Sequence, residues 1–461
     1  MIHLEPINNV ESGDQLLSLL TLVEPNELEK EQIVQAINRV CNWNRWYEVA
    51  SFNKIVPMCY YSLLQLNLKH LLPEPIFFKM EAEAMEVKKA NELRNKEAAI
   101  FLKEFQKNNI AVALLKGVAF GEVVYKNPSY KRMNDIDLLV KKENIDAIYA
   151  IYNTLGYFYF GERISGSKEK SDKITHLSPP YVNKDFTCVI GTQWGIKTPL
   201  GSFRINYEKL WSRMSLAHFM GIDMPVLSPE DNLHHLCLHM GYFKISVRDV
   251  MDLYNLIRVF RNKFDWNLFC EIVDESHSHN SVYFGLKLSQ FLCPMAEVQT
   301  FIRRIENKVS TRYKRAVAWK TRSMDVFLNL HSDHIQTIEK ELAVFNCTSY
   351  FPEKIYFFFN LWKFILWPSE SEVIHMSALY KPTFIQIVNA RMAMPYKILR
   401  AIASEIGWYL VFLLIIKINI ELFGSLFKLP FNSREKCDME AYSKKNGLPL
   451  QKLVELKAQF Q

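Results

Sequence analysis

The sequence predicts an α/β (α+β) protein in which a small mixed sheet is embedded in a predominantly helical envelope. Of the 461 residues, 49% are apolar and 13% are aromatic, which is ample material for a large core. Only 15 residues are glycine, well below the average usage of about 7%. Few glycines allow few tight turns, so long helices are favoured over a β-rich fold. Short apolar runs of strand length gather between residues 110 and 194.

The chain is longer than a usual single domain, so several units that share one body are expected. We predict an N-terminal helical region at 1–95, an α/β core at 96–215, a helical domain at 216–345 and a C-terminal helical, aromatic-rich region at 346–461. Within the core, the order strand, helix, strand, helix and further strands predicts a mixed sheet with helices on one face.

The first hundred residues are predicted to be helical. From Glu27 to Val40 apolar residues recur at helical spacing among charged ones, and the pattern continues from Trp43 to Leu66. The stretch from Phe77 to Lys107 is rich in Glu, Lys and Ala and predicts one long helix that leads directly into the first core strand. No residue pattern with a chemical role is present in this region.

The core begins with a strand, a sharp break and a short helix. Ile110 to Leu115 is an apolar run long enough for one buried strand, and Lys116-Gly117 interrupts it. A helix of about two turns is expected over 118–125. Turn residues then lead to a second apolar strand, Asp135 to Val140.

Two acids stand at the start of this second strand. Asp135 and Asp137 are separated by one residue, so in a strand their side chains point to the same face. Two like charges side by side are costly unless a cation compensates them. Carboxylate oxygens suit a divalent ion such as Mg²⁺ or Mn²⁺, with substrate phosphates completing its coordination. The alternative to metal binding is a turn plus a cap, which Asp-X-Asp often forms at the start of a strand.

The order of strand, L-K-G at 115–117, helix and R-x-x-D-I-D-L-L-V at 132–140 resembles the DNA polymerase β-like nucleotidyltransferase superfamily. More narrowly, it resembles the uncharacterised nucleotidyltransferase family, found mainly in bacteria, in which L-K-G stands where other members have a Gly-Ser pair. The two motifs are specific at this spacing. The resemblance extends, more weakly, over 46–258.

The resemblance implies a nucleotidyltransferase core that moves a nucleoside monophosphate from Mg²⁺-NTP to a hydroxyl-bearing acceptor, which is unknown. Asp135 and Asp137 are then expected to hold the metal. Lys116 and the backbone N–H of Gly117 are expected to bind the triphosphate at a helix N-terminus. Arg132 is expected either to bind phosphate or to orient the carboxylates. No general base is identified.

The sequence departs from the superfamily at the third carboxylate. Enzymes of this kind usually have an acid on a later strand, and related sequences tend to have acid-Leu-His-Trp there. This chain reads G-T-Q-W at 191–194, so Gly191 replaces the acid and Gln193 replaces the histidine. The third acid helps to hold the metal that activates the attacking hydroxyl. Its loss favours a rival interpretation, a catalytically degenerate protein that binds a nucleotide or scaffolds a partner.

Other acids lie near the expected position. Asp185 has the right strand parity, but six residues of strand at about 3.3 Å each would place it about 20 Å away. If the alignment is shifted, Glu162 or Asp172 in the preceding polar loop would be candidates.

Three further polar sites each allow two interpretations. His176 alternates with apolar residues and either faces the carboxylates or is an ordinary hydrogen-bonded histidine. His235 and His239 are four apart on one helix, which is zinc-ligand spacing, but their apolar neighbours favour burial. Arg248 is expected to pair with Asp252 one turn later, with a contact to phosphate as the alternative.

The charge and cysteine content bound the environment. The net charge of +7 is spread along the chain, which suits a phosphate-bearing ligand but gives no strong nucleic-acid signal. Eight scattered cysteines without metal-ligand spacing predict free thiols in a reducing compartment. The polar, acidic N-terminus argues against a signal peptide, so we predict a cytoplasmic protein.

The C-terminal region contains a short apolar run at 406–416 that follows a basic, aliphatic stretch at 391–400. Eleven residues cannot cross a hydrocarbon core of about 30 Å, which needs roughly 20. A buried helix is expected, and a weak contact with a membrane surface through these C-terminal helices stays open.

Overall fold

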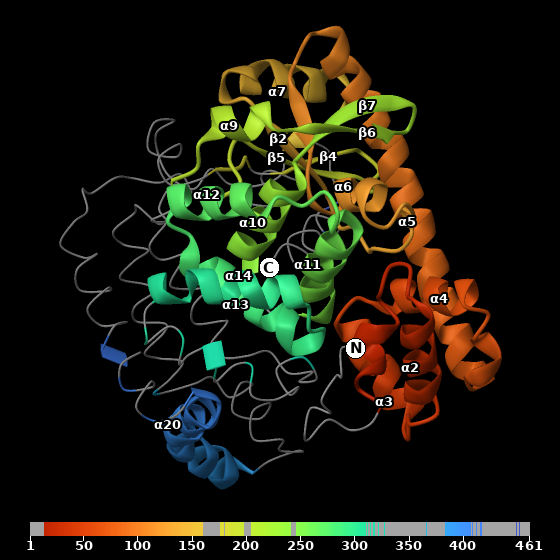
Figure 1. Cartoon of the computed structure of the whole chain (residues 1–461), viewed down its shortest axis with the longest axis vertical. Helices are drawn as coiled ribbons and strands as arrows, with labels where there is room; N and C mark the ends of the chain where they lie inside the picture. The colour runs from red at the N-terminus through yellow and green to blue at the C-terminus, as the bar shows by residue number, and fades with distance from the viewer. Residues whose placement is uncertain are drawn as a thin grey trace.

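The fold is described from a computed structural model. It describes residues 13–159, 176–178, 180–197, 204–240, 246–309 and 383–406, together with isolated positions after 309. Within these ranges a mixed sheet is surrounded by helices, which confirms the predicted α/β fold with a helical envelope (Figure 1).

The sheet of the described region has seven strands in the order β3-β4-β5-β2-β1-β7-β6. The strands are β1 (Val112–Leu114), β2 (Ile136–Val140), β3 (Phe158–Tyr159), β4 (Tyr181–Val182), β5 (Val189–Gln193), β6 (Ser215–Phe219) and β7 (Ile222–Val226). The central strand β2 is antiparallel to β1 and parallel to β5, while β1 is parallel to β7. The start of β2, with its two acids, therefore lies beside the start of β5.

One face of the sheet is covered by α5 (Glu74–Lys107), α6 (Lys116–Val123) and α7 (Ile145–Thr154). Phe101 and Phe105 of α5 and Tyr152 of α7 are fully buried there and contact one another edge to face or tilted. The predicted long helix is confirmed. It begins with Pro75 in its first turn, where a missing N–H costs nothing.

The opposite face is covered by α9 (Tyr207–Ser212) and α10 (Pro229–Met240). Leu210 and Leu238 of these helices share a cluster with Ala113, Leu115 and Leu139 of the central strands. The expectation of helices on one face only was therefore wrong. Apolar side chains of β1 and β2 point to both faces of the sheet, so helices have to cover both faces.

The remaining helices form one envelope below the sheet in Figure 1. They are α1 (Leu16–Leu19), α2 (Glu27–Ile37), α3 (Trp43–Phe52), α4 (Val56–Gln65), α11 (Val247–Phe260), α12 (Trp266–Ser276), α13 (His279–Leu292) and α14 (Ala296–Ile305). Short 3₁₀ turns lie at Lys69–Leu71, Lys142–Asn144 and Glu306–Lys308. A single hydrophobic cluster joins the first four helices to α10–α14, although the long helix and most of the sheet lie between the two groups in the chain.

The predicted regions 1–95, 96–215, 216–345 and 346–461 stay predictions. In the structure α5 runs without interruption across 95, and β7 extends the sheet to Val226. The C-terminal helix α20 (Phe384–Ile406) lies at the lower edge of Figure 1. None of the helices in the described ranges is both long enough and apolar enough to cross a bilayer. Cysteines 41, 59, 188, 237, 270 and 293 are free thiols.

Candidate functional site

The junction between β1 and α6 is a sharp turn at Lys116. Leu115 is extended, with φ −122° and ψ 167°, and its N–H donates to the carbonyl of Asp137 at 3.0 Å. Lys116, the first residue of α6, has φ +47°, in the left-handed region. A side chain is strained there, and such strain persists where the surroundings fix it, commonly at functional sites. The turn directs the lysine side chain toward β2.

The two predicted acids lie next to this lysine. Asp137 is buried on β2, and its Oδ1 is 3.0 Å from Nζ of Lys116. Burial would lower the pKa of Lys116, but Asp137, Asp135 and Asp249 outweigh it and raise that pKa, so the ammonium is charged. Burial and the charge of Asp137 raise the pKa of Asp135 to about 6, against the opposing effects of Lys116 and Arg94. The carboxylate pair is thus only partly neutralised by the protein.

Gly191 faces this pair directly. In the parallel β2–β5 ladder Asp137 is in register with Gly191. A Cβ at position 191 would lie 3.1 Å from Oδ1 of Asp137 and 3.9 Å from Oδ2 of Asp135. Gln193, two residues on and buried, donates its Nε2 to the same Oδ1 at 3.4 Å. Position 191 is therefore where a third carboxylate would meet the other two, and glycine supplies none.

Of the other acids named from the sequence, the structure describes Asp185 alone. Asp185 lies in the turn between β4 and β5, and Glu162 and Asp172 lie outside the described residues. In the part of the chain that the structure describes, no three or more His, Cys, Asp or Glu side chains form a metal-binding group.

The donor set fits one divalent ion. Asp135 and Asp137 offer hard carboxylate oxygens, which Mg²⁺ and Mn²⁺ prefer. The raised pKa of Asp135 shows that burial and the second carboxylate leave negative charge that a cation would stabilise. A magnesium ion usually keeps only one or two protein carboxylates and takes its other oxygens from phosphates and water. A second ion lacks an anionic ligand at position 191.

Gly117 allows the first turn of α6 to pack against the segment that leads into β2. A Cβ at position 117 would be 2.9 Å from Cγ of Met133, which is itself buried. Any larger residue would have to displace Met133, two positions before Asp135. The predicted glycine therefore has a packing role in addition to its backbone N–H.

His176 lies beside the end of β5, and its contact with a nucleotide stays a prediction. Its carbonyl accepts from the N–H of Trp194 at 2.8 Å. Burial, followed by the charges of Lys116 and Lys197, lowers its pKa to about 4. Burial and Lys116 also lower the pKa of His235 well below its usual range. His235 is buried and His239 exposed, so the two side chains of the zinc-like spacing lie in different environments.

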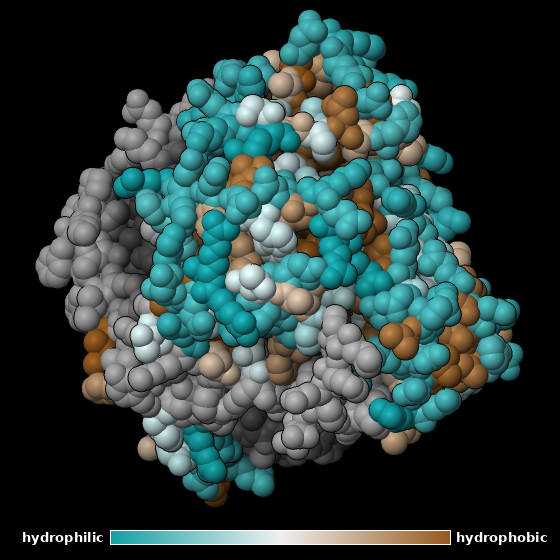
Figure 2. All heavy atoms as spheres, in the orientation of Figure 1, coloured by the Kyte–Doolittle hydropathy of each residue, from teal (hydrophilic) through white to brown (hydrophobic). Residues whose placement is uncertain are grey.

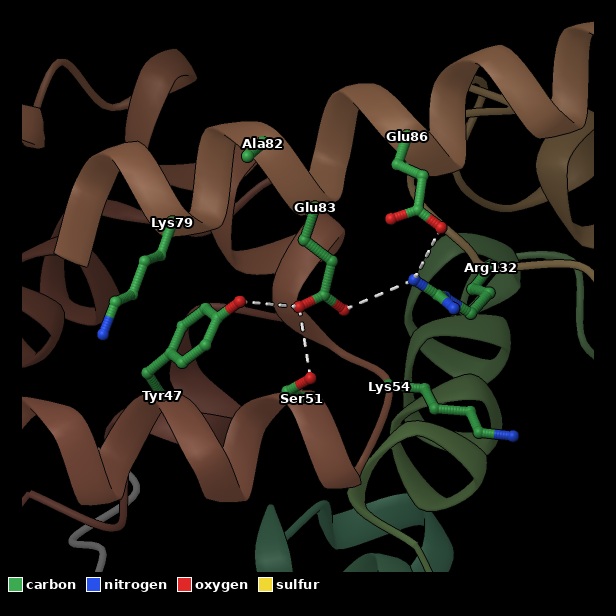
Figure 3. Close-up of a pocket in the computed structure, with 8 residues that line it drawn as sticks. All are labelled: Tyr47, Ser51, Lys54, Lys79, Ala82, Glu83, Glu86 and Arg132. Atoms are coloured by element: carbon green, nitrogen blue, oxygen red, sulfur yellow. Dashed lines mark hydrogen bonds and ion pairs between the residues drawn. The ribbon is translucent and has the colours of Figure 1, made fainter. Parts of the chain in front are cut away.

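Arg132 faces α5, where its Nη2 is 3.7 Å from Glu83 and 3.9 Å from Glu86 (Figure 3). Both distances exceed a hydrogen bond, so the pairing is loose. A cation that acts on Asp135 from the α5 side is Arg94, whose Nε is buried and has no hydrogen-bond partner among the residues that the structure describes. Burial lowers the pKa of Arg94, while Cys188 and Asp135 oppose that effect. Sequence reasoning missed Arg94, because nothing distinguishes it from the other charged residues of the long helix.

The predicted pairing of Arg248 with Asp252 is wrong. Arg248 donates from Nε and Nη2 to Oδ1 of its neighbour Asp249, at 3.2 and 3.0 Å. Asp252 instead pairs with Lys131 and accepts from the hydroxyl of Tyr125 at 2.6 Å. Spacing along a helix cannot reveal a partner from another element. A contact of Arg248 with phosphate stays a prediction.

The segment 124–135, here called the site loop, is held from two sides. On one side Asp252 of α11 binds Lys131 and Tyr125. On the other side Asn91 of α5, fully buried, donates to the carbonyls of Pro128 at 2.7 Å and Lys131 at 2.8 Å. These contacts fix the approach of the chain to Asp135.

A family model described as "Uncharacterised nucleotidyltransferase" matches residues 40–294, more than half of the chain. The chain belongs to this family. A general nucleotidyltransferase role follows from the membership, and the resemblance seen in the two motifs is confirmed. The searches of curated proteins and of solved structures each returned no match.

The nucleotidyltransferase match contains the whole sheet and the helices on both of its faces. It also contains α11 to α13, so the envelope that anchors the site loop belongs to the family region. Helices α14 and α20 lie beyond its end at residue 294.

Proposed function

We propose that this nucleotidyltransferase moves a nucleoside monophosphate from an NTP to a hydroxyl-bearing acceptor, with Mg²⁺ or Mn²⁺. The observation that carries the proposal is the meeting of Asp135, Asp137 and Lys116 at the start of α6. Two acids on one strand, one of them 3.0 Å from a lysine at a helix N-terminus, suit a metal-bound triphosphate.

Asp135 and Asp137 would hold the divalent ion, which would neutralise charge on the triphosphate. The ammonium of Lys116 could then pair with either of two anionic groups, the carboxylate of Asp137 or a phosphate. Once a cation compensates the acids, its ammonium can turn to the triphosphate. The first N–H groups of α6, including that of Gly117, have no hydrogen-bond partner within the helix. They and the positive end of the helix dipole would both face the triphosphate.

In the transfer, an acceptor hydroxyl oxygen forms a bond to the α-phosphorus, and the bond from that phosphorus to the bridging oxygen of the β-phosphate breaks. Pyrophosphate leaves, and the hydroxyl proton passes to water. This chain has Gly191 and Gln193 where an acid and a histidine would assist the acceptor, and we assign no general base. Transfer should therefore be slow.

A second candidate is a nucleotide-binding protein without turnover, in which the same residues bind Mg²⁺-NTP and report its presence. The glycine in register with Asp137 favours this alternative. The two candidates share the binding step and differ only in pyrophosphate release.

The binding step is tested by calorimetry with each of the four common NTPs, with and without Mg²⁺. We expect Mg²⁺-dependent binding by the wild type and loss of most of it in Asp137→Asn. Asp185→Asn, an exposed acid at the β4–β5 turn, is the matched control and should bind normally. Unchanged affinity in a folded Asp137→Asn protein would remove the metal-nucleotide proposal.

A further inference from the structure

A polar cavity lies between α3 and α5, and Arg132 forms part of its lining (Figure 3). Its volume of about 480 Å³ is within the range of roughly 300–1,000 Å³ that small-ligand sites occupy. We call it the α3–α5 pocket. It is lined by Tyr47, Ser51, Lys54, Lys79, Ala82, Glu83, Glu86 and Arg132.

The floor of the pocket is preorganised around Glu83. Its Oε2 accepts from the hydroxyls of Tyr47 and Ser51, both at 3.1 Å, and its side chain is only 12% exposed. Glu86, one turn on, is 75% exposed and open to a ligand. Figure 3 shows the ammonium groups of Lys79 and Lys54 pointing away from Glu83. The pocket therefore presents the exposed carboxylate of Glu86 beside the loosely paired guanidinium of Arg132.

Arg132 joins this pocket to the carboxylate pair. It forms one wall of the pocket and stands three residues before Asp135 in the site loop. Arg94, farther along α5, interacts electrostatically with both Arg132 and Asp135. A molecule in the pocket and a nucleotide at the acids would therefore lie at nearby positions of one short segment.

The distance along α5 between the two sites sets the length of a molecule that would reach both. Glu83 and Arg94 are eleven positions apart on α5 (94 − 83), which at about 1.5 Å per residue is roughly 16 Å along the axis. A single sugar or amino acid is too short to occupy the pocket while its hydroxyl reacts beside Asp135. The occupant must be extended.

The lining favours hydroxyl groups over other chemistry. Hydroxyls both donate and accept, which matches a wall of carboxylates, ammonium groups and a guanidinium with one aromatic ring. Ala82 is the one aliphatic residue of the lining, so an apolar peptide anchor finds little to contact. Three cations against two carboxylates give too small an excess for a nucleic-acid backbone.

We propose that the α3–α5 pocket is the acceptor site of this protein and takes the distal part of an oligosaccharide. The proposal rests on the proposed function, since the reacting hydroxyl of that chain would lie next to Asp135 and Asp137. In this proposal Tyr47 and Glu86 contact the distal sugar units, and Arg132 contacts the part of the chain that leads toward Asp135.

The test uses fluorescently labelled full-length protein on an array of immobilised oligosaccharides and the matching monosaccharides. Ala82→Trp fills the pocket from an exposed helix position, and Glu86→Gln removes the exposed carboxylate. Lys89→Trp and Glu92→Gln, exposed positions of α5 outside the pocket, are the matched controls. Mg²⁺-NTP affinity is measured on the same five proteins by calorimetry.

We expect the wild type to bind at least one oligosaccharide and no monosaccharide. Glu86→Gln should weaken that binding by about tenfold or more, because a hydrogen bond to a charged group is lost. Ala82→Trp should weaken it at least as much by filling the pocket, while the controls and all nucleotide affinities stay unchanged. A wild type that binds Mg²⁺-NTP but no oligosaccharide overturns the acceptor site and leaves the proposed function standing. Equal oligosaccharide binding by wild type and both pocket variants also overturns it.

Discussion

The charge balance around Asp135 and Asp137 determines what the site can bind. Two carboxylates face one ammonium, that of Lys116, while Arg94 acts on Asp135 from behind. The result is a pair in which Asp135 has a pKa of about 6. Metal binding requires the deprotonated acid, so the affinity for Mg²⁺ should increase as the pH rises through this value.

The raised pKa of Asp135 also predicts that the free energy of unfolding depends on pH. The pKa of Asp135 lies above its unfolded value of 3.8, so the folded state binds more protons between pH 4 and 6. The resulting stabilisation is complete below pH 3.8 and is lost as the pH rises through about 6. In EDTA, the free energy of unfolding of the wild type minus that of Asp135→Asn should fall over this window, as measured by urea denaturation. A difference that is flat or rises would contradict the assigned environment.

Lys116→Met is expected to weaken Mg²⁺-NTP binding by about 1.5–3 kcal/mol, on the order of tenfold to a hundredfold in Kd, because a charged hydrogen bond to phosphate is lost. Mg²⁺ alone should bind at least as well as before, since Lys116 no longer competes for Oδ1 of Asp137. Calorimetry with and without nucleotide separates the two effects. A variant that loses thermal stability but keeps its nucleotide affinity would make Lys116 a purely structural partner.

Most of the carboxylate centre could be predicted from the sequence, because its residues lie within two short motifs. Strand periodicity placed Asp135 and Asp137 on one face, and the alignment placed Gly191 opposite them, where the β2–β5 register has it. The electrostatic effects of Arg94 on Asp135 and of Asp249 on Lys116 could not be predicted, since each comes from a helix outside the two motifs. The role of Arg132 stays a prediction, because its visible partners are Glu83 and Glu86.

At the scale of elements, the site depends on how the site loop is held between α5 and α11. Asn91 supplies two buried donors to loop carbonyls, and Asp252 holds Lys131 and Tyr125 from the other helix. Buried carbonyls without partners cost free energy, so these contacts define one loop conformation.

Asn91→Ala is expected to lower the free energy of unfolding by about 1–3 kcal/mol, since the carbonyls of Pro128 and Lys131 lose their donor. Nucleotide affinity should fall as well, because the loop positions Asp135. Denaturant titration and calorimetry measure the two changes. Asn108→Ala, at the exposed end of the same helix, is the control and should affect neither. Normal nucleotide binding in a destabilised Asn91→Ala protein would show that the loop does not position the acids.

Strands and helices of the core were predicted better than their arrangement. The apolar runs at 110–115 and 135–140 correspond to β1 and β2, and the helix over 77–107 lies within α5. That α9, between β5 and β6, and α10, after β7, cover the second face could not be foreseen, because tertiary packing decides which face of a sheet a helix covers. The partner of Asp252 was missed for the same reason: it is set by tertiary packing.

At the scale of the whole molecule, the N-terminal helices and α11–α14 act as one body. Asn255 of α11 donates to the carbonyl of Thr21 and accepts from the N–H of Val23, and Arg258 pairs with Glu29. These contacts, with the shared hydrophobic cluster, make the wall of the α3–α5 pocket continuous with the helices that hold the site loop.

We propose that α20 gives the protein a weak contact with anionic membranes. Apolar side chains on this helix are exposed: Phe384, Ile385, Val388, Met392 and Tyr396. The basic residues of the same helix are Arg391, Lys397 and Arg400. Exposed apolar residues beside basic ones suit the surface of an anionic bilayer.

Flotation with liposomes that contain phosphatidylglycerol should recover part of the wild type and much less of a Phe384→Glu, Met392→Glu protein. Neutral phosphatidylcholine liposomes and Gln386→Glu serve as controls. Equal recovery of the wild type and the double variant would remove this contact.

The central claim concerns Gly191: the site binds Mg²⁺-NTP with two acids, and the missing third acid limits transfer. Gly191→Asp would restore an acid in register with Asp137. Its Cβ would be 3.1 Å from Oδ1 of Asp137, so the carboxylate of Asp137 must shift slightly. Three acids together repel one another, and a divalent ion relieves the repulsion. Mg²⁺ should therefore stabilise this variant more than it stabilises the wild type.

The most direct test is the rate of pyrophosphate release from Mg²⁺-NTP, with water or a generic hydroxyl compound as acceptor. We predict a wild-type rate well below about 1 s⁻¹, the lower end of the usual enzyme range, and a faster rate in Gly191→Asp without tighter NTP binding. A wild type that releases pyrophosphate at about 1 s⁻¹ or faster would contradict the account, because the third acid would then be unnecessary or would come from elsewhere in the chain.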